Sequence, residues 1–98
     1  MENTTMTNRI TQKDLEAVCK RINMITGNAL KPYFRNEEGK LIANIGNYHI
    51  DGAYGGVALH QMQNEAGGIR DVLGSGHVSK RELYNRMQAF IRGLESKS

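Results

Sequence analysis

The sequence lacks several features that define whole classes of protein. Its 98 residues include no tryptophan, one proline and one cysteine, Cys19, so an internal disulfide framework is excluded and a reducing compartment is favoured. No apolar run approaches the roughly 20 residues that a membrane-spanning helix needs. The polar start, MENTTMTN, has no apolar centre of the kind that a signal peptide requires. We therefore expect an intracellular protein with no membrane segment.

Composition and charge indicate an ordinary globular domain. Hydrophobic residues make up 39% of the chain and charged residues 23%, and the net charge is only +3. That charge is too small to establish nucleic-acid binding by itself. Most of the excess lies in residues 65–98, which carry six basic and four acidic groups. The length predicts one domain at 10–95, with flexible ends at 1–9 and 96–98.

Segments of helical pattern lie near both ends of the chain. The first, 12–26, follows Thr11, which can form a capping box with Asp14. The second, 80–94, follows Ser79, and a glutamate three residues later repeats that motif. Apolar residues recur at helical spacing in both segments and predict two buried stripes. These are Leu15, Val18, Cys19, Ile22 and Ile25 in the first, and Leu83, Met87, Phe90, Ile91 and Leu94 in the second.

Glycines dominate the stretch between the helices. Nine of the eleven lie between Gly39 and Gly76, separated by short apolar or alternating runs. The runs predict an antiparallel meander of strands at 33–36, 40–45, 48–50, 57–64 and 69–73. The second strand would have one face made of Leu41, Ala43 and Ile45. We predict an α+β fold: a helix, an antiparallel sheet of three to five short strands and a second helix, with both helices on one face of the sheet.

The segment from Gly74 to Arg81 is the strongest candidate site. It is a glycine-rich loop that leads into a helix N-terminus, where unpaired N–H groups and a partial positive charge attract anions. A helix built only for stability would have acids in its first turn, whereas this one has Lys80 and Arg81. Ordinary solvated surface cations are the alternative interpretation. The phosphate-binding residues that we predict are Gly74, Gly76, His77, Ser79, Lys80 and Arg81.

The order G-x-G and then S-K-R in this segment is similar to the end of the double-stranded-RNA-binding domain, where a G-x-G loop leads into S-K-K. The matching residues are Gly74, Gly76, Ser79, Lys80 and Arg81. The resemblance implies that Lys80 and Arg81 would hold phosphate. It also implies that Gln12 and Glu16 of the first helix would face a minor groove. The last helix departs from the alanine-rich pattern of that family.

Four further motifs lie along the chain: N-x-G-N-Y-H from Asn44, A-Y-G-G from Ala53, N-x-x-G-G from Asn64 and K-R-E-L-Y from Lys80. Together they resemble small phage-encoded accessory proteins of unknown role. The resemblance implies the cytoplasm of a bacterial host as the setting, and a role in binding or inhibiting a host factor.

Chemistry-bearing residues form no recognisable catalytic or metal-binding motif. His49, His60 and His77 lack the paired spacing of metal ligands. His49 and Asp51 would share one face of a strand, but no nucleophile or phosphate loop accompanies them. We predict no catalytic residue, no metal site, no cofactor and no enzyme activity.

Tyrosines near the glycine-dense stretch 52–56 suggest a second contact site. Aromatic side chains on an open sheet face can stack on bases or pack against a protein. The predicted partner or ligand residues are Asn47, Tyr48, His49 and Tyr54.

The leading hypothesis is a phage-type, non-catalytic binding protein that contacts nucleic acid through the Gly74 to Arg81 loop. The alternative is a protein-binding inhibitor or small-ligand-binding accessory factor that acts on a host system. Either could form a homo-oligomer.

Overall fold

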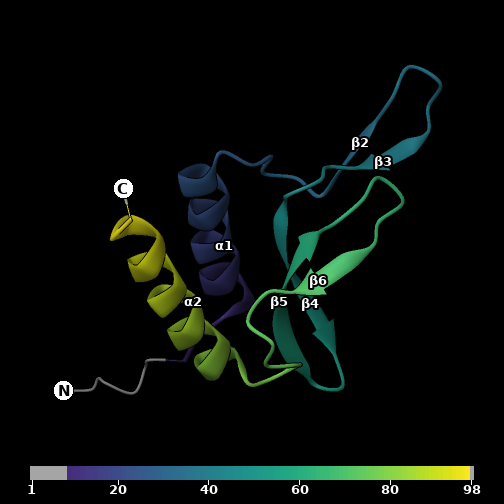
Figure 1. The fold of residues 1–98 in the computed structure, drawn as a ribbon. Helices are drawn as coiled ribbons and strands as arrows, with labels where there is room; N and C mark the ends of the chain where they lie inside the picture. The colour runs from purple at the N-terminus through teal and green to yellow at the C-terminus, as the bar shows by residue number, and fades with distance from the viewer. Residues whose placement is uncertain (1–8, 98) are drawn as a thin grey trace.

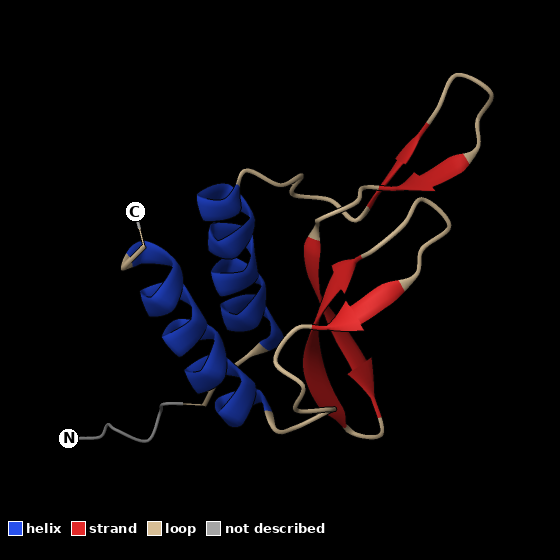
Figure 2. Cartoon of the chain, in the orientation of Figure 1, coloured by secondary structure: helices blue, strands red, loops and turns tan. Residues whose placement is uncertain are grey.

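The chain folds in the order helix, five strands, helix. The structure, a computed structural model, describes residues 9–97. Most of the predicted flexible start, and Ser98, lie outside these residues. The predicted α+β class and element order are confirmed (Figure 1, Figure 2). The elements are α1 (Gln12–Thr26), β2 (Tyr33–Arg35), β3 (Leu41–Ala43), β4 (Tyr48–Ala53), β5 (Gly56–Met62), β6 (Ile69–Asp71) and α2 (Lys80–Glu95).

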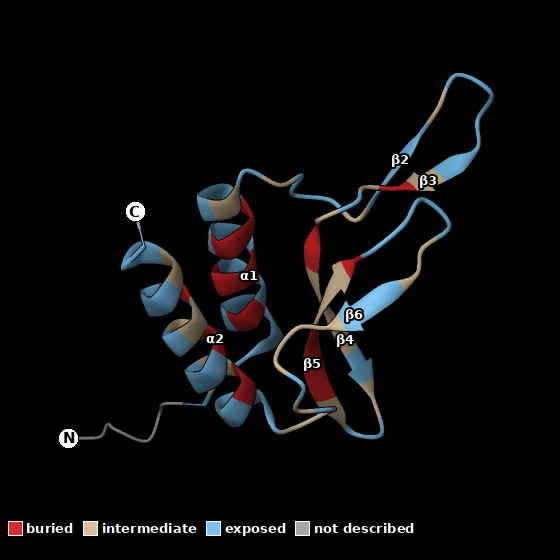
Figure 3. Ribbon diagram, in the orientation of Figure 1, coloured by how far each residue is buried: buried red, intermediate tan, exposed pale blue. Residues whose placement is uncertain are grey.

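Both helices pack on one face of a three-stranded antiparallel sheet. The sheet has the order β4-β5-β6, and α1 and α2 lie side by side against it (Figure 1). The predicted apolar stripes supply most of the core, which follows the facing sides of the helices and sheet (Figure 3). The core residues are Leu15, Val18, Cys19, Ile22, Tyr48, Val57, Leu59, Leu83, Met87 and Ile91.

β2 and β3 form a separate two-stranded hairpin that projects beyond this sheet (Figure 1). The prediction of one continuous meander was therefore wrong at this point. Of the predicted face of Leu41, Ala43 and Ile45, Ala43 is buried, but Leu41 and Ile45 are 51% and 59% exposed. The hairpin contacts the loop before β6 instead of a neighbouring strand: the Ala43 N–H donates to the Glu65 carbonyl at 3.1 Å.

Local capping fixes where each helix begins. The Thr11 hydroxyl accepts from the Asp14 N–H, and the Asp14 carboxylate accepts from the Thr11 N–H, which confirms the capping box of α1. The Ser79 hydroxyl accepts from the Glu82 N–H at 3.1 Å and so caps α2. Among residues 9–97, neither helix has the length and apolar character needed to cross a membrane.

Candidate functional site

The three-stranded sheet presents polar side chains on the face away from the helices. Tyr48 of β4 and Leu59 of β5 belong to the core on the helical side. Because side chains alternate along a strand, His49, Asp51 and His60 point to the opposite side. His49 and His60 are also direct cross-strand partners. Residues that are distant in sequence therefore meet on this open face.

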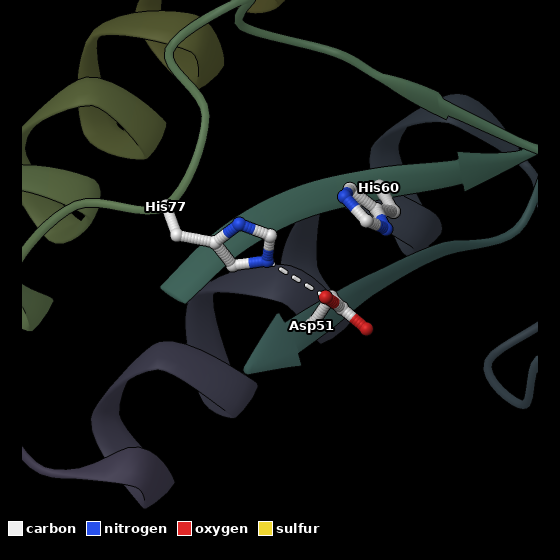
Figure 4. A group of neighbouring side chains, drawn as sticks. All are labelled: Asp51, His60 and His77. Atoms are coloured by element: carbon white, nitrogen blue, oxygen red, sulfur yellow. Dashed lines mark hydrogen bonds and ion pairs between the residues drawn. The ribbon is translucent and has the colours of Figure 1, made fainter. Parts of the chain in front are cut away.

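The loop before α2 brings His77 onto the same face. Val57 and Val78 form a β-bridge in which each N–H donates to the other's carbonyl oxygen, at 2.8 and 2.9 Å. His77, next to Val78, lies with its Nε2 atom 2.8 Å from Asp51 Oδ2 (Figure 4). One potential ligand atom from each of Asp51, His60 and His77 lies within 4.8 Å of the others. We call these three residues the Asp–His cluster.

Aromatic rings extend from the cluster in two directions. His60 packs edge-on against both His49 and His77, with ring centroids 5.9 Å apart in each pair. The Tyr54 ring packs in the same way against His77, at 5.8 Å. The four rings form a row from β4 to the turn between β4 and β5. A ligand held by the Asp–His cluster would therefore lie beside the Tyr54 ring.

The surroundings keep Asp51 ionised and favour the neutral form of the neighbouring His49. The hydrogen bond with His77 lowers the pKa of Asp51 below its usual value, so Asp51 is ionised at neutral pH. Burial and the neighbouring His60 lower the pKa of His49, although the Asp51 charge acts in the opposite direction. His49 also lies with its Nδ1 atom 3.2 Å from Asn47 Oδ1.

Asp71 contributes a second carboxylate at the margin of this face. It is the cross-strand partner of His60, so His49, His60 and Asp71 occupy one row across β4, β5 and β6. One oxygen of Asp71 accepts from the Gly76 N–H at 2.8 Å. Within the part of the chain that the structure describes, its other oxygen is buried and has no hydrogen-bond partner. A buried carboxylate oxygen without a partner is costly and needs an explanation.

Tyr54 occupies the turn between β4 and β5 in an unusual conformation. Ala53 pairs with Gly56, so Tyr54 and Gly55 form a two-residue turn with φ values of 54° and 74°. A type I′ turn needs positive φ at both positions and favours asparagine, aspartate or glycine at the first. Tyr54 is instead a large aromatic residue, and it is 97% exposed.

The structure separates the predicted contact residues into two groups. Asn47 and Tyr48 are buried: the Asn47 amide donates to the Ala29 carbonyl at 2.8 Å, and the Tyr48 ring packs against Phe90. These two residues support the fold and offer little surface to a partner. His49 and Tyr54 lie at opposite ends of the ring row described above.

The predicted phosphate-binding loop lies beside that row. In this loop, His77 contacts Asp51, and Ser79 caps α2. Lys80 and Arg81 are exposed in the first turn of α2. The loop and the predicted tyrosine site are therefore neighbours, a relationship that the sequence did not indicate.

Sequence reasoning missed the Asp–His cluster. It considered His49 with Asp51 because they are two positions apart on one strand. The true partner of Asp51 is His77, and that contact depends on the Val57–Val78 bridge. No spacing rule for metal ligands covers a set drawn from two strands and a loop, so the sequence carried no signal that would have identified it.

A cavity of about 330 Å³ lies beside β4, between this strand, α1 and the segment after α1. Cys19 is one of its lining residues and donates a hydrogen bond from Sγ to the Tyr48 carbonyl at 3.2 Å. Burial, assisted by the nearby Glu16, raises the pKa of the Cys19 thiol to about 12. A thiol that stays protonated is a poor nucleophile, which agrees with the interpretation of Cys19 as a core residue.

No protein-family model, curated protein or solved structure matches the chain. The resemblances to phage accessory proteins and to the double-stranded-RNA-binding domain stay predictions. The function must therefore be inferred from the geometry of the open face.

Proposed function

We propose that this protein is a non-catalytic nucleic-acid-binding protein whose contact surface joins the Tyr54 turn to the loop from Gly74 to Arg81. The observation that carries the proposal is Tyr54 itself. The residue is 97% exposed, and its backbone has a positive φ that costs a non-glycine residue free energy. Neither core packing nor turn geometry accounts for a tyrosine here, whereas recognition of a ligand does.

The surroundings of Tyr54 favour a nucleic acid as that ligand. Its ring lies against His77, and His77 precedes the helix start that carries Lys80 and Arg81. Proteins that bind single strands combine aromatic rings, on which bases stack, with cations that contact the phosphates. The partial positive charge at the N-terminal end of α2 also favours anions. A single strand, RNA or DNA, fits this combination because its bases are free to stack.

Fluorescence anisotropy with labelled oligonucleotides tests the proposal. We expect 15-nucleotide single strands to bind the full chain at low salt and to bind much less tightly at moderate salt, because phosphate contacts release counterions. Duplexes of the same length should bind more weakly. Absence of binding at low salt, or binding that does not depend on salt, would overturn the proposal.

Two pairs of variants make the test specific. Tyr54→Ala should weaken binding about 5- to 100-fold, the usual range for loss of one base stack, whereas Tyr54→Phe should retain it. Lys80→Gln should weaken binding and lower its salt dependence. Lys40→Gln, the same charge change in the β2–β3 hairpin, should have little effect. Equal effects of Lys80→Gln and Lys40→Gln would show that only net charge matters.

A protein partner is the second candidate, because the β2–β3 hairpin carries apolar residues, is largely exposed and lies far from the turn between β4 and β5 (Figure 3). Phe34 is 47% exposed, and its cross-strand partner Ile42, on the same face of the hairpin, is half-buried. Exposed apolar groups that cluster often mark interaction sites. A host protein bound here should be retained after nuclease treatment, lost in Phe34→Ser and unaffected by Tyr54→Ala. The phage resemblance supports a bacterial cytoplasm as the setting for either candidate.

A further inference from the structure

The Asp–His cluster has the composition of a transition-metal site. Two imidazoles and one carboxylate are ligands that zinc takes readily, and sites with three protein ligands keep a further position for water or another ligand. Asp51, His60 and His77 come from β4, β5 and the loop before α2. Their side chains lie next to one another (Figure 4), and one potential ligand atom of each lies within 4.8 Å of the others.

The distances are close to those that coordination needs. Ligand atoms about 2.1 Å from a tetrahedral zinc ion are roughly 3.4 Å from each other. His77 Nε2 and Asp51 Oδ2 are 2.8 Å apart, and the His60 donor lies within 4.8 Å of both. Small side-chain rotations would open the first pair and bring His60 closer. The backbone is already fixed by the β4–β5 ladder and the Val57–Val78 bridge.

The site is accessible to an ion from solution. The Asp51 side chain is 42% exposed and that of His77 is 19% exposed. An aspartate is ionised at neutral pH, because its ordinary pKa is about 3.9. An ion would therefore gain an anionic ligand without first displacing a proton from it.

The carboxylate of Asp71 supports a metal site independently of the distances within the Asp–His cluster. Its buried oxygen has no partner among residues 9–97, and it lies across the strand pair from His60. The structure shows ring contacts but no hydrogen bond for the His60 imidazole in the same part of the chain. Metal-bound histidines usually donate their second ring N–H to a carboxylate or carbonyl, which fixes the ring. As the cross-strand partner of His60, Asp71 is the carboxylate to which we assign this role.

We propose that Asp51, His60 and His77 bind a divalent zinc ion, with Asp71 orienting His60. The proposal does not depend on nucleic-acid binding. A zinc ion here would fasten the loop before α2 to the sheet and would leave a coordination position facing solvent beside Tyr54.

Titration of the full chain with zinc sulfate by calorimetry at pH 7.5 tests the site. One equivalent should bind. The variants Asp51→Asn, His60→Gln and His77→Gln should each weaken binding at least 10-fold. His49→Gln removes a histidine from the same row but outside the cluster, and should leave affinity within about threefold. Asp71→Asn should weaken binding about 10- to 100-fold, as loss of a partner that orients a ligand does.

Two further measurements keep the test decisive if a variant folds poorly. In the unaltered protein, zinc should shift the imidazole NMR signals of His60 and His77 strongly and those of His49 weakly. Cobalt should give the visible absorption bands of a tetrahedral site, and these should disappear when zinc is added. The proposal is overturned if zinc does not bind at 100 μM, if His49 shows the largest shift, or if His49→Gln loses as much affinity as His77→Gln.

Discussion

The Nε2 atom of His77 lies 2.8 Å from Asp51 Oδ2, which joins the loop before α2 to β4. This contact depends on the close approach of Gly56 at the start of β5 to the backbone around Val78. A β-carbon built on Gly56 would lie 2.9 Å from the Val78 carbonyl oxygen and 3.1 Å from the His77 carbonyl carbon. The absence of a side chain at Gly56 is therefore a condition for the candidate site.

Gly56→Ala should displace the loop and destabilise the protein. The atoms in the way belong to the backbone and cannot rotate aside, so we expect a loss of about 1–3 kcal/mol in the free energy of unfolding. The His77 ring signals in an NMR spectrum should also move. The matched control is Gly52→Ala, at which the added β-carbon would lie 3.8 Å from the Gly56 carbonyl oxygen, an ordinary contact distance. That variant should be neutral or slightly stabilising, and equal losses in both would contradict the role assigned to Gly56.

Local signals were sufficient to predict the elements of this fold. The first helix was predicted at 12–26 and lies at Gln12–Thr26, because its capping box and apolar stripe are encoded in adjacent residues. The strands were also predicted close to their observed positions. The separation of the β2–β3 hairpin could not be predicted, because it depends on tertiary hydrogen bonds such as that from Ala43 to Glu65.

The candidate site depends even more on tertiary structure. His60 shares a face with Asp51 only because the β4–β5 register places His60 opposite His49. A shift of one residue in that register would turn His60 to the helical side. His77 reaches the same face only through the bridge between Val57 and Val78. The sequence contains the residue types of the site but no local pattern that would place them together.

Asn23 supports the edge of β4 from the helix beside it. Its side-chain Nδ2 donates to the Tyr48 carbonyl oxygen at 2.9 Å, and its side-chain Oδ1 accepts from the Tyr48 N–H at 2.8 Å. Asn23→Ala would leave buried backbone groups with fewer partners, so we expect a loss of about 2–3 kcal/mol in urea unfolding. Asn85→Ala, at an exposed position of α2, should change stability by less than about 0.5 kcal/mol. A similar small effect at both positions would show that water replaces the Asn23 bonds.

Cys19 should make stability depend on alkaline pH. Its pKa is about 12 in the folded protein against an ordinary value of 9.0, so the unfolded chain loses this proton first as the pH rises. The contribution of the protonated Cys19 thiol to the free energy of unfolding is fully present below pH 9.0 and is lost between pH 9.0 and about 12. We compare the free energy of unfolding of each protein at a pH of about 10.5 with its own value at about pH 8. Over this range the wild type should lose about 2 kcal/mol more than Cys19→Ala. Parallel curves for the two proteins in urea unfolding would contradict the raised pKa.

Tyr54 should show opposite effects on stability and binding. Asparagine adopts a positive φ more easily than tyrosine, and the exposed ring contributes little packing. We therefore expect Tyr54→Asn to raise the free energy of unfolding by about 0.5–1 kcal/mol while it weakens binding to single-stranded oligonucleotides. Tyr54→Phe keeps both the ring and the unfavourable conformation, so its stability and binding should stay near those of the wild type. If Tyr54→Asn instead lowers the free energy of unfolding, the contact between the Tyr54 ring and His77 stabilises the fold. The presence of a tyrosine in the turn would then be explained by stability and would no longer indicate a bound ligand.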